Sequence, residues 1–505
     1  MLLKELTRAV QAIRVEGPLD REITGITCDS RQIMPGMVFV AVPGVHVDGH
    51  NFIPNAIDRG AAAIICERNG FVPQRATKIK VPSIRTALAQ AAAAFYHYPA
   101  RRLKVIGVTG TNGKTTVAFL IKHLLEAAGT KTGLVGTVRY EIGDRVIPAQ
   151  RTTPEALEIQ RLMAHMVNAQ CQACVMEVSS HALEQQRVGE IEFDATVFTN
   201  LTQDHLDYHG TMEKYYSAKE KLFTAEAHGS KRGAHVINID DSFGTRLWQN
   251  GQAEVKLTYG LHEHASIRAA HIHLSKDNSR FQVDTPKGSF TCTLPLIGRH
   301  NVYNALAAIG TALALDVPIE TLRAALSVAP PVPGRLEGVA LGQPFGVFVD
   351  YAHTDDALHN VLTTLREMTP GRLLVAFGCG GNRDAGKRPK MGKVAAEQAD
   401  FAIITSDNPR QESAADIAQQ IEGGYRAVRA NGYRVELDRR RAIQEIIRMA
   451  RKGDTVLIAG KGHETYQEFE DTVIPFDDRV FARETLEELG FGKPQRRSEK
   501  PATKH

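Results

Sequence analysis

A glycine-rich run at positions 110–116, Gly-Thr-Asn-Gly-Lys-Thr-Thr, has the residue types that bind the phosphates of a nucleotide. An apolar segment that we expect to form a buried strand (103–108) precedes it, and apolar residues at helical spacing (117–124) follow it. Glycines let backbone amides approach phosphate oxygens, and the N-terminus of the helix adds partial positive charge. We expect the Lys114 ammonium to reach the β- and γ-phosphates and the Thr115 hydroxyl to bind Mg²⁺.

The run departs from the general phosphate-loop pattern because Val108 stands where that pattern has its first glycine. The alternative is a glycine-rich turn without a ligand, but a strand, glycines, a lysine and a double threonine occur here together. The residues expected to hold the nucleotide in this loop are Gly110, Thr111, Asn112, Gly113, Lys114, Thr115 and Thr116.

The elements that must position this loop divide into three blocks and a tail. Residues 1–98 hold short β-like runs and Ala-rich helical stretches, and residues 99–331 contain the loop. Residues 332–492 alternate strand and helix, which predicts a doubly wound, Rossmann-like and mainly parallel sheet. Residues 493–505 form a basic tail without apolar periodicity that we expect to be disordered. The predicted fold class is α/β, with ligands beyond the carboxyl ends of parallel strands.

Individual elements can also be predicted. In the first block we expect a strand over 37–42 and helical stretches over 56–63 and 86–98, and in the second a helix over 213–223. In the last block the predicted strands are 346–349, 372–377, 401–405, 433–437 and 454–459, and the predicted helices are 391–399, 414–428 and 441–450.

The composition is that of a globular enzyme. The chain has 505 residues, 43% of them hydrophobic, and a formal net charge of +4, so nothing argues for nucleic-acid binding. The N-terminus carries charges where a signal peptide needs apolar residues, and no run is long enough to span a membrane. Six scattered cysteines suit a reducing compartment, and we expect Cys171 and Cys174 to be buried thiols. We therefore expect a cytoplasmic protein, and a monomer.

Four further motifs follow the loop in order. They are Met-Glu-Val-Ser-Ser-His-Ala-Leu at 176–183, Asn-Leu-Thr-Gln-Asp-His-Leu-Asp-Tyr-His-Gly at 200–210, Gly-Arg-His-Asn-Val-Tyr-Asn-Ala at 298–305 and Val-Asp-Tyr-Ala-His-Thr at 349–354. With the loop segment 107–116, this set resembles the signature of the Mur ligases and their folylpolyglutamate synthetase relatives. The motifs are spread over nearly the whole chain before the tail. Jointly they are much more specific than the loop alone.

The resemblance implies both an architecture and an activity. The architecture has a uridine-binding α/β domain, a central phosphate-loop ATPase-like domain and an amino-acid-binding Rossmann-like domain. The activity is that of an ATP-dependent, amide-bond-forming ligase of peptidoglycan synthesis. The members that it resembles add meso-2,6-diaminopimelate to UDP-N-acetylmuramoyl-L-alanyl-D-glutamate. They do so through an acyl phosphate and release ADP and phosphate.

The resemblance also assigns a catalytic set around two Mg²⁺ ions. It implies that Glu177 and His205 complete a metal shell to which Thr115 contributes, although His205 alone would be read as a solvated loop residue. It implies that Lys219 is carbamylated by CO₂, which converts a cation into an anionic oxygen donor for the metal. On its residue type alone, Lys219 would be a solvated surface lysine. Lys114, Lys219, His205 and Glu177 are therefore the expected catalytic residues.

Other binding residues follow from matching motif positions. Asn301 and Asn304, which share one face of a helix, are expected beside the nucleotide with Arg335 and Asp350. Ser30, Val45, His46 and Val47 match the segments that hold the UDP end. The residues that match the muramoyl-peptide site are Thr152, Thr153, Ser179, Gln185 and Arg187.

Three loops of the last block, each after a predicted strand, carry the side chains expected to bind the incoming amino acid. Asp407 and Glu464 suit an ammonium, whereas Arg383 and Arg410 suit carboxylates through forked hydrogen bonds. Meso-diaminopimelate carries a second amino-acid head, and this set is complementary to it. The Asp-Asn-Pro-Arg run resembles the diaminopimelate-adding members, because lysine-adding relatives lack its arginine. The expected set is Arg383, Asp407, Asn408, Pro409, Arg410, Gly460 and Glu464.

Competing hypotheses stay open on the sequence. A lysine-adding Mur ligase would use the same chemistry, and a folylpolyglutamate synthetase is disfavoured because a uridine-binding block precedes the loop. A phosphate-loop NTPase or kinase would hydrolyse ATP or phosphorylate a product without dependence on diaminopimelate. A non-catalytic UDP-sugar-binding protein would leave Lys114, Glu177 and His205 without a role.

Overall fold

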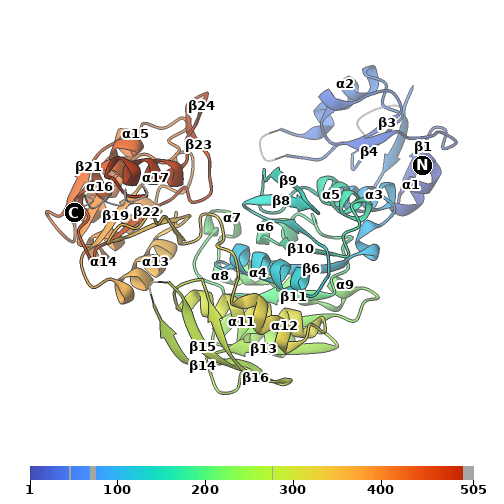
Figure 1. The fold of residues 1–505 in the computed structure, drawn as a ribbon. Helices are drawn as coiled ribbons and strands as arrows, with labels where there is room; N and C mark the ends of the chain where they lie inside the picture. Colours follow the sequence, from blue (N-terminus) through green and yellow to red (C-terminus); the bar gives the residue numbers. More distant parts are fainter. Residues whose placement is uncertain (45–46, 69–74, 276, 493–505) are drawn as a thin grey trace, which may run out of the picture. The chain divides into compact units, whose positions relative to one another are not determined.

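The computed structural model describes residues 1–44, 47–68, 75–275 and 277–492. Three sheets follow one another along the chain, and a two-stranded hairpin lies near its end (Figure 1). The chain divides into two compact units, one formed by 1–272, 280–294 and 300–329 and the other by 273–279, 295–299 and the residues from 330 on. The α/β fold class is confirmed. The predicted domain boundaries at 98, 331 and 492 stay predictions.

The first block forms a five-stranded sheet in the order β1-β5-β4-β3-β2, parallel except for β1. Leu3, Leu6 and Leu88 from two helices pack against one face of it. The helix predicted over 56–63 is wrong in its second half: α2 ends at Asp58, a turn with Gly60 at φ +91° follows, and Ala63 begins a fully buried strand. The elements are α1 (Leu3–Ala9), β1 (Arg14–Glu16), β2 (Gly25–Thr27), β3 (Met37–Val40), α2 (Ile53–Asp58), β4 (Ala63–Cys66), β5 (Thr77–Lys80) and α3 (Ile84–Phe95).

The second block forms an eleven-stranded sheet in the order β16-β15-β14-β13-β12-β11-β6-β10-β7-β8-β9. The strands from β7 to β14 in this order run parallel, so their carboxyl ends meet at one edge. Cys171 and Cys174 are buried free thiols, as predicted. The strands are β6 (Lys104–Thr109), β7 (Thr132–Val135), β8 (Arg139–Ile142), β9 (Arg145–Pro148), β10 (Ala173–Glu177), β11 (Ala195–Phe198), β12 (Ala234–Asn238), β13 (Val255–Gly260), β14 (Ile267–Leu274), β15 (Ser279–Thr285) and β16 (Gly288–Leu294).

Helices of the second block cover this sheet and carry several predicted site residues. The helix expected over 213–223 is α8 followed by a short 3₁₀ turn at 221–223. The helices are α4 (Lys114–Ala127), α5 (Ala156–Asn168), α6 (Ser180–Glu184), α7 (Leu206–His209), α8 (Met212–Glu220), α9 (Ala225–His228), α10 (Ser242–Asn250), α11 (Arg299–Ala314) and α12 (Ile319–Leu326).

The third block is the doubly wound sheet that the sequence predicts, in the order β17-β18-β22-β19-β20-β21 and parallel apart from β17. Alternate residues of one strand point to opposite faces. Val375 therefore packs with α13, α14 and α15, while Leu374 packs with α16 and α17. The elements are β17 (Glu337–Gly338), β18 (Gly346–Asp350), α13 (Asp355–Met368), β19 (Leu373–Phe377), α14 (Lys387–Gln398), β20 (Phe401–Ile404), α15 (Ala414–Arg426), β21 (Tyr433–Val435), α16 (Arg439–Met449), β22 (Thr455–Ala459), β23 (Tyr466–Phe469), β24 (Thr472–Pro475) and α17 (Asp478–Glu488).

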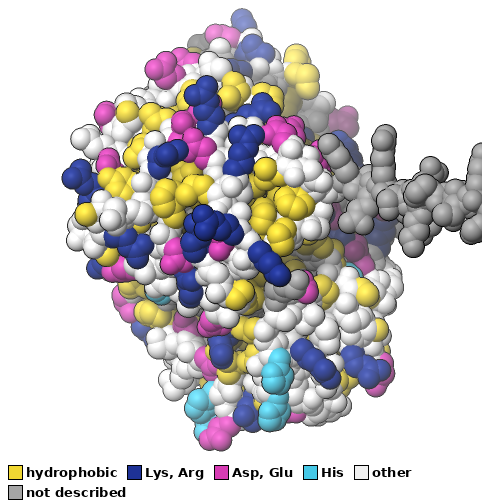
Figure 2. Space-filling view, turned by 60° about the vertical axis from the view of Figure 1, so that its left-hand side comes forward, with side chains coloured by type: hydrophobic (Ala, Val, Ile, Leu, Met, Phe, Trp, Pro, Cys, Tyr) yellow, Lys and Arg dark blue, Asp and Glu magenta, His cyan; other side chains and the backbone are white. Residues whose placement is uncertain are grey.

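The surface that Figure 2 shows carries basic and acidic side chains side by side, with apolar side chains between them. Within the described part of the chain, no helix has both the length and the hydropathy to cross a membrane.

A buried ion pair ties α16 and α17 to the strand ends of the third block. The Arg439 guanidinium donates from Nε and Nη2 to the Asp478 carboxylate at 2.8 and 2.7 Å, and both side chains are fully buried. Arg439 also donates to the carbonyls of Ala459 and Ser406, at 2.9 and 3.2 Å. The pair therefore lies directly beneath the loops that follow β20 and β22.

We predict that Arg439→Met lowers the free energy of unfolding by about 3–5 kcal/mol, because it leaves the Asp478 carboxylate buried without a partner. Adding Asp478→Leu should recover most of the loss. Arg448→Met is the control, since Arg448 pairs with Glu488 across the same two helices but lies half-exposed. It should cost less than about 1 kcal/mol. Urea denaturation of the full chain measures all three, and an equal cost for the two single variants would contradict the prediction.

Candidate active site

The glycine-rich run links β6 to α4, as predicted, and its backbone needs glycine. Gly110 and Gly113 have φ of +147° and +87°, which side chains with a Cβ rarely adopt. A Cβ on Gly110 would collide with Oγ1 of Thr199, and one on Gly113 would lie 2.5 Å from Oδ1 of Asn304. The Lys114 ammonium folds back over the loop and donates to the carbonyls of Gly110 and Thr111 at 3.0 and 2.8 Å.

The loop is fastened to the residues that follow the neighbouring strand β11. Asn200 accepts from the amides of Thr111 and Asn112, through its carbonyl at 2.8 Å and its Oδ1 at 2.9 Å. The hydroxyl of Thr199 and Nδ2 of Asn200 both donate to the Asn112 carbonyl, at 2.6 and 3.1 Å. Thr199 and Asn200 were not predicted as site residues. A sequence cannot show that β11 is the strand beside β6.

Glu177 ends β10 and is buried beside the start of α4. Its carboxylate accepts from the Thr115 hydroxyl at 3.0 Å and from the amide and hydroxyl of Thr137 at 2.8 and 3.0 Å. These donors are neutral, and Glu177 forms no ion pair with any residue that the structure describes. A buried carboxylate without a counter-charge is costly. A hard cation held by the Glu177 carboxylate and the Thr115 hydroxyl would supply that charge.

His205 lies in the motif loop before α7 with a left-handed backbone, φ +53°. Its half-exposed ring has Nε2 3.3 Å from Asp204 and its centroid 4.9 Å from that of His181. No hydrogen bond or ion pair joins His205 to Glu177, and no group of three or more His, Cys, Asp or Glu side chains in the described ranges is placed to hold a metal. The metal role of His205 and Glu177 thus stays a prediction.

Lys219 is buried, not a solvated surface lysine as its residue type alone suggests. Only 2% of the residue is exposed, and Nζ donates to the carbonyl of Gly110 at 2.9 Å. The ammonium lies 4.7 Å from the centre of the Tyr215 ring. Burial, and then the Lys114 cation, lower the pKa of Lys219 well below its usual value, with Asp204 opposing them. Part of its population is therefore a neutral, nucleophilic amine at lower pH than for an ordinary lysine.

The residues predicted for the muramoyl peptide converge around the end of β10. The Thr153 hydroxyl donates to the Glu177 carbonyl at 2.7 Å and accepts from the Ser179 amide at 3.0 Å. Arg187 donates to the Thr153 carbonyl at 2.8 Å and to Oε1 of Gln185 at 2.7 Å. Thr152 joins the cluster through Thr137, whose hydroxyl lies 3.0 Å from its own. The structure therefore brings all five predicted residues together, next to Glu177.

The first block reaches this cluster through a residue that sequence reasoning missed. Arg85, near the start of α3, donates to Oε1 of Gln185 and to the carbonyl of Pro43, each at 3.4 Å. Ser30 is buried, while Val47 is 51% exposed. The predicted Val45 and His46 lie outside the described residues.

The predicted nucleotide residues fall into two groups. Asn301 and Asn304 lie on α11 and are buried, and Nδ2 of Asn304 donates to Oδ1 of Asn301 at 2.9 Å, which confirms that they share a face. In the other compact unit, the guanidinium of Arg335 lies 5.0 Å from the Tyr351 ring centre. Asp350 ends β18 and accepts from two backbone amides, at 2.6 and 2.8 Å. Burial raises the pKa of Asp350, and Arg335 opposes that shift.

In the third block, the loops after β20 and β22 meet at the carboxyl edge of the sheet. Nδ2 of Asn408 donates to Oε2 of Glu464 at 3.0 Å, and Oδ1 accepts from the Lys461 ammonium at 2.9 Å. A Cβ on Gly460 would lie 2.6 Å from Oδ2 of Asp407, so the two loops are in close contact. Burial acts to raise the pKa of Asp407, but Lys461 and Arg439 outweigh it and lower that pKa. Burial raises the pKa of Glu464. Lys461 was not predicted.

The two predicted arginines flank the glycines that follow β19. A Cβ on Gly380 would lie 3.2 Å from Nη1 of Arg410 and 3.8 Å from Cγ of Arg383. Arg410 already has partners, because Nε donates to the Glu468 carboxylate at 2.9 Å and Nη1 donates to the Gly381 carbonyl at 2.9 Å. Glu468 belongs to the β23–β24 hairpin, which the sequence did not predict.

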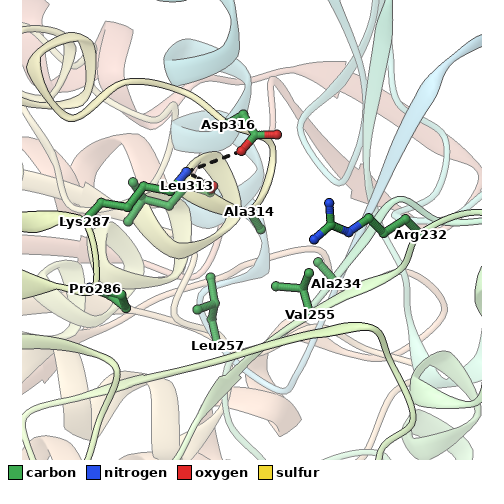
Figure 3. A pocket seen from close by; sticks show the side chains of 9 residues that line it. All are labelled: Arg232, Ala234, Val255, Leu257, Pro286, Lys287, Leu313, Ala314 and Asp316. Carbon is green, nitrogen blue, oxygen red and sulfur yellow. Dashed lines mark hydrogen bonds and ion pairs between the residues drawn. The ribbon is translucent and has the colours of Figure 1, made fainter.

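A separate hollow of about 240 Å³ lies at the opposite edge of the central sheet, where β12 and β13 begin (Figure 3). Val255 and Leu257 form an apolar wall, and Arg232 faces Lys287 and Asp316 across the opening. None of the predicted site residues lines it.

Models of three family domains match successive parts of the chain. The Mur ligase family catalytic domain matches residues 22–96, the Mur ligase middle domain residues 108–312, and the Mur ligase glutamate ligase domain residues 334–462. The chain belongs to the Mur ligase family. The glycine-rich loop, the cluster next to Glu177 and the loops after β19, β20 and β22 are thus parts of a Mur ligase.

Related Mur ligases resemble this one over almost their full length. A protein of Syntrophomonas wolfei is 45% identical over 96% of this chain and 98% of its own, and one of Geobacillus thermodenitrificans is 46% identical over 92% and 95%. Both are named UDP-N-acetylmuramoyl-L-alanyl-D-glutamate–2,6-diaminopimelate ligase. A solved structure of the same name is 32% identical and superposes with a TM-score of 0.69 over 97% of this chain and 99% of that one.

A folylpolyglutamate synthase of Mycobacterium tuberculosis also superposes, with a TM-score of 0.61 and 18% identity, over 74% of this chain. At this identity the likeness is one of fold.

We predict that Gly110→Ala lowers the affinity for ATP by on the order of tenfold or more, because the new Cβ displaces Thr199 and with it the loop amides. Gly129→Ala is the matched control, since Gly129 follows the same helix α4 at φ +82° but a Cβ there meets nothing within 4 Å. Isothermal titration with a non-hydrolysable ATP analogue measures both variants. Equal affinity of Gly110→Ala and wild type would contradict this account of the loop.

Proposed function

We propose that this Mur ligase uses ATP to join meso-2,6-diaminopimelate to UDP-N-acetylmuramoyl-L-alanyl-D-glutamate, releasing ADP and phosphate. The observation that carries the proposal is the set of two carboxylates and two arginines on the loops after three parallel strands of the third block. The full-length similarity to relatives with this name supports the same substrates. ATP and a UDP-linked substrate fit a cytoplasmic enzyme, and we infer that it acts as a monomer.

These side chains suit the distal end of diaminopimelate. Asp407 and Glu464 would bind its ammonium, and Arg383 and Arg410 its carboxylate, with Asn408, Pro409 and Gly460 shaping the walls. L-lysine has the ammonium but no distal carboxylate. A site built on these arginines would therefore reject lysine, because their hydrogen bonds to substrate would be missing.

We assign ATP to the loop after β6. The backbone of residues 110–116 and the Lys114 ammonium would hold the phosphates, and Asn301, Asn304, Arg335 and Asp350 would hold the rest of the nucleotide. In the same proposal Thr152, Thr153, Ser179, Gln185 and Arg187 bind the peptide of the second substrate. Ser30 and residues 45–47 bind its uridine end.

The hydroxyl of Thr115 and the carboxylate of Glu177 are 3.0 Å apart and buried, and both are oxygen ligands of the kind that Mg²⁺ prefers. We assign these two residues, with His205 and a carbamate on Lys219, to two Mg²⁺ ions. When bound, Mg²⁺ would neutralise charge on the phosphates. The uncompensated burial of Glu177 fits this assignment.

A carbamate on Lys219 would form when its neutral amine attacks CO₂, with a new N–C bond and release of one proton. Burial and the Lys114 cation favour the neutral amine that this reaction needs. The resulting anion would also remove the repulsion between two ammonium groups that contact the same carbonyl, that of Gly110.

The proposed reaction has two steps. The glutamate carboxylate of the UDP-linked substrate attacks the γ-phosphorus of ATP, an O–P bond forms, and the bond to ADP breaks. Lys114 stabilises the charge that spreads over the phosphate oxygens. The amine of diaminopimelate then attacks the acyl carbon, phosphate leaves, and the amine loses a proton as the amide forms.

The first test of the function compares amino acids. Phosphate release from ATP with the UDP-linked dipeptide should require meso-diaminopimelate, with kcat/KM for L-lysine lower by on the order of 10³-fold or more. Arg410→Gln should lower kcat/KM for diaminopimelate by about 10²-fold and leave that for lysine nearly unchanged. Arg434→Gln, at an exposed ion pair on β21, is the control and should match wild type. Equal use of lysine by wild type would overturn the assignment.

The second test concerns Lys219. Lys219→Met should lower the rate of phosphate release by more than about 10²-fold while ATP still binds. Lys214→Met, on the exposed side of the same helix α8, should change little. In wild type supplied with ¹³C-bicarbonate, NMR should show a carbamate carbon that Lys219→Met lacks. Absence of that signal from wild type with ATP and Mg²⁺ bound would refute the carbamate.

A further inference from the structure

Lys461 is a buried cation of the third block to which the proposed function gives no part. It follows Gly460 in the loop after β22, and none of its side chain is exposed. Nζ donates to Oδ1 of Asn408 at 2.9 Å and to Oε2 of Glu464 at 3.1 Å. Burying a lysine is costly unless it is paired. Here its partners are two residues assigned to the amino-acid substrate.

Lys461 fixes the orientation of the Asn408 side chain. An ammonium only donates, so the atom of the Asn408 amide that faces it must be oxygen. That oxygen also accepts from the amide of Glu468 at 3.0 Å. Nδ2 is thereby directed at Oε2 of Glu464, to which it donates at 3.0 Å. The three side chains form a closed triangle of hydrogen bonds.

The triangle leaves one oxygen of Glu464 available. Oε2 receives both Lys461 and Asn408, whereas Oε1 receives no hydrogen bond from the part of the chain that the structure describes. The Glu464 side chain is 18% exposed, so it is not sealed from a ligand. An ammonium group is the natural partner of a partly buried carboxylate oxygen.

The charges around Glu464 also favour a cation. The carboxylates of Asp407, Glu464 and Asp478 face the cations of Lys461 and Arg439. The phenols of Tyr351 and Tyr466 lie nearby and are neutral at physiological pH. The other titratable neighbours are His353 beside Asp407, Arg335 beside Tyr351, and Arg410 and Glu468 beside Tyr466. Glu464 itself pairs with one cation, Lys461, and faces one further carboxylate, Asp407. A substrate ammonium at Oε1 would supply a second cation.

We propose that Lys461 is a positioning residue that sets substrate specificity: it orients Asn408 and holds Glu464 as a carboxylate, whose Oε1 takes the distal ammonium of the amino acid. Lys461 itself does not touch the substrate. The inference rests on the proposed function, because it concerns how the residues assigned to the amino acid distinguish diaminopimelate from amino acids without a distal amine.

Replacing Lys461 by a neutral residue raises the pKa of Glu464. Burial and the neighbouring Asp407 raise the pKa of Glu464, and Lys461 opposes that shift. Without Lys461 the pKa rises further, so a larger share of Glu464 is protonated and neutral at a given pH. The loss of ammonium binding should therefore grow as the pH falls.

The test uses Lys461→Met and Lys461→Gln in the full chain, with Lys461→Arg as the charge-conserving variant. Steady-state kinetics compare meso-diaminopimelate with 2-aminopimelate, which keeps the distal carboxylate but lacks the distal amine, between about pH 6 and about pH 9. For both neutral variants, we expect KM for diaminopimelate to rise on the order of 10- to 100-fold, more at the acidic end, while KM for ATP stays unchanged. The efficiency with 2-aminopimelate should change less than about threefold.

Lys461→Arg should keep the pH profile of wild type, because guanidinium stays charged. Combining Lys461→Met with Glu464→Gln should add no further loss for diaminopimelate, since both act through the same carboxylate. Equal loss with both amino acids, or a loss independent of pH, would show a merely structural lysine and overturn the inference. If one of the two neutral variants, Lys461→Met or Lys461→Gln, does not fold, the other is sufficient for the test. Failure of wild type to use diaminopimelate would instead refute the proposed function.

Discussion

The arrangement of the glycine-rich loop and its two lysines depends on one contact, the close approach of the Gly110 backbone to Thr199. Only a residue without a side chain allows the end of β6 to lie this close to the residues after β11. That closeness lets Asn200 hold the amides of Thr111 and Asn112, and it brings the Gly110 carbonyl within reach of both Lys114 and Lys219. Two lysines that are 105 positions apart in the sequence therefore share one acceptor.

The two candidate sites differ in whether their buried charges have partners of opposite sign. In the third block the buried cations Arg439 and Lys461 each have a partner of opposite sign, Asp478 and Glu464. In the first unit Glu177 has only neutral donors, and Lys219 lies near another cation. Incomplete compensation of this kind costs stability. Functional sites commonly show such incomplete compensation, because their ligands bring their own charge.

The sequence predicted the elements of the third block well because buried parallel strands are short apolar runs separated by helical periodicity. β22 and β19 begin within one residue of their predicted positions. It failed in the second half of 56–63, because the alanines after Gly60 suit a continuing helix as well as the approach to a buried strand. The motifs predicted the glycine-rich loop between β6 and α4 and named the residues that converge next to Glu177 and after β20 and β22, whose binding roles stay predictions. They could not give Arg85, Lys461 or Glu468, because their importance comes from contacts between segments distant in the chain.

Because Glu468 forms an ion pair with Arg410, any other carboxylate must compete with Glu468 for this arginine. Glu468 is tethered to the arginine through the hairpin, whose backbone also accepts from the Arg410 amide at 3.1 Å. A tethered group acts at an effective concentration on the order of millimolar or higher. A stray monocarboxylate at lower concentration leaves this pair intact. Under the proposed function, a substrate that engages several of these side chains at once would gain enough binding free energy to share or replace the pair, so Arg410 would select the whole substrate over an isolated carboxylate.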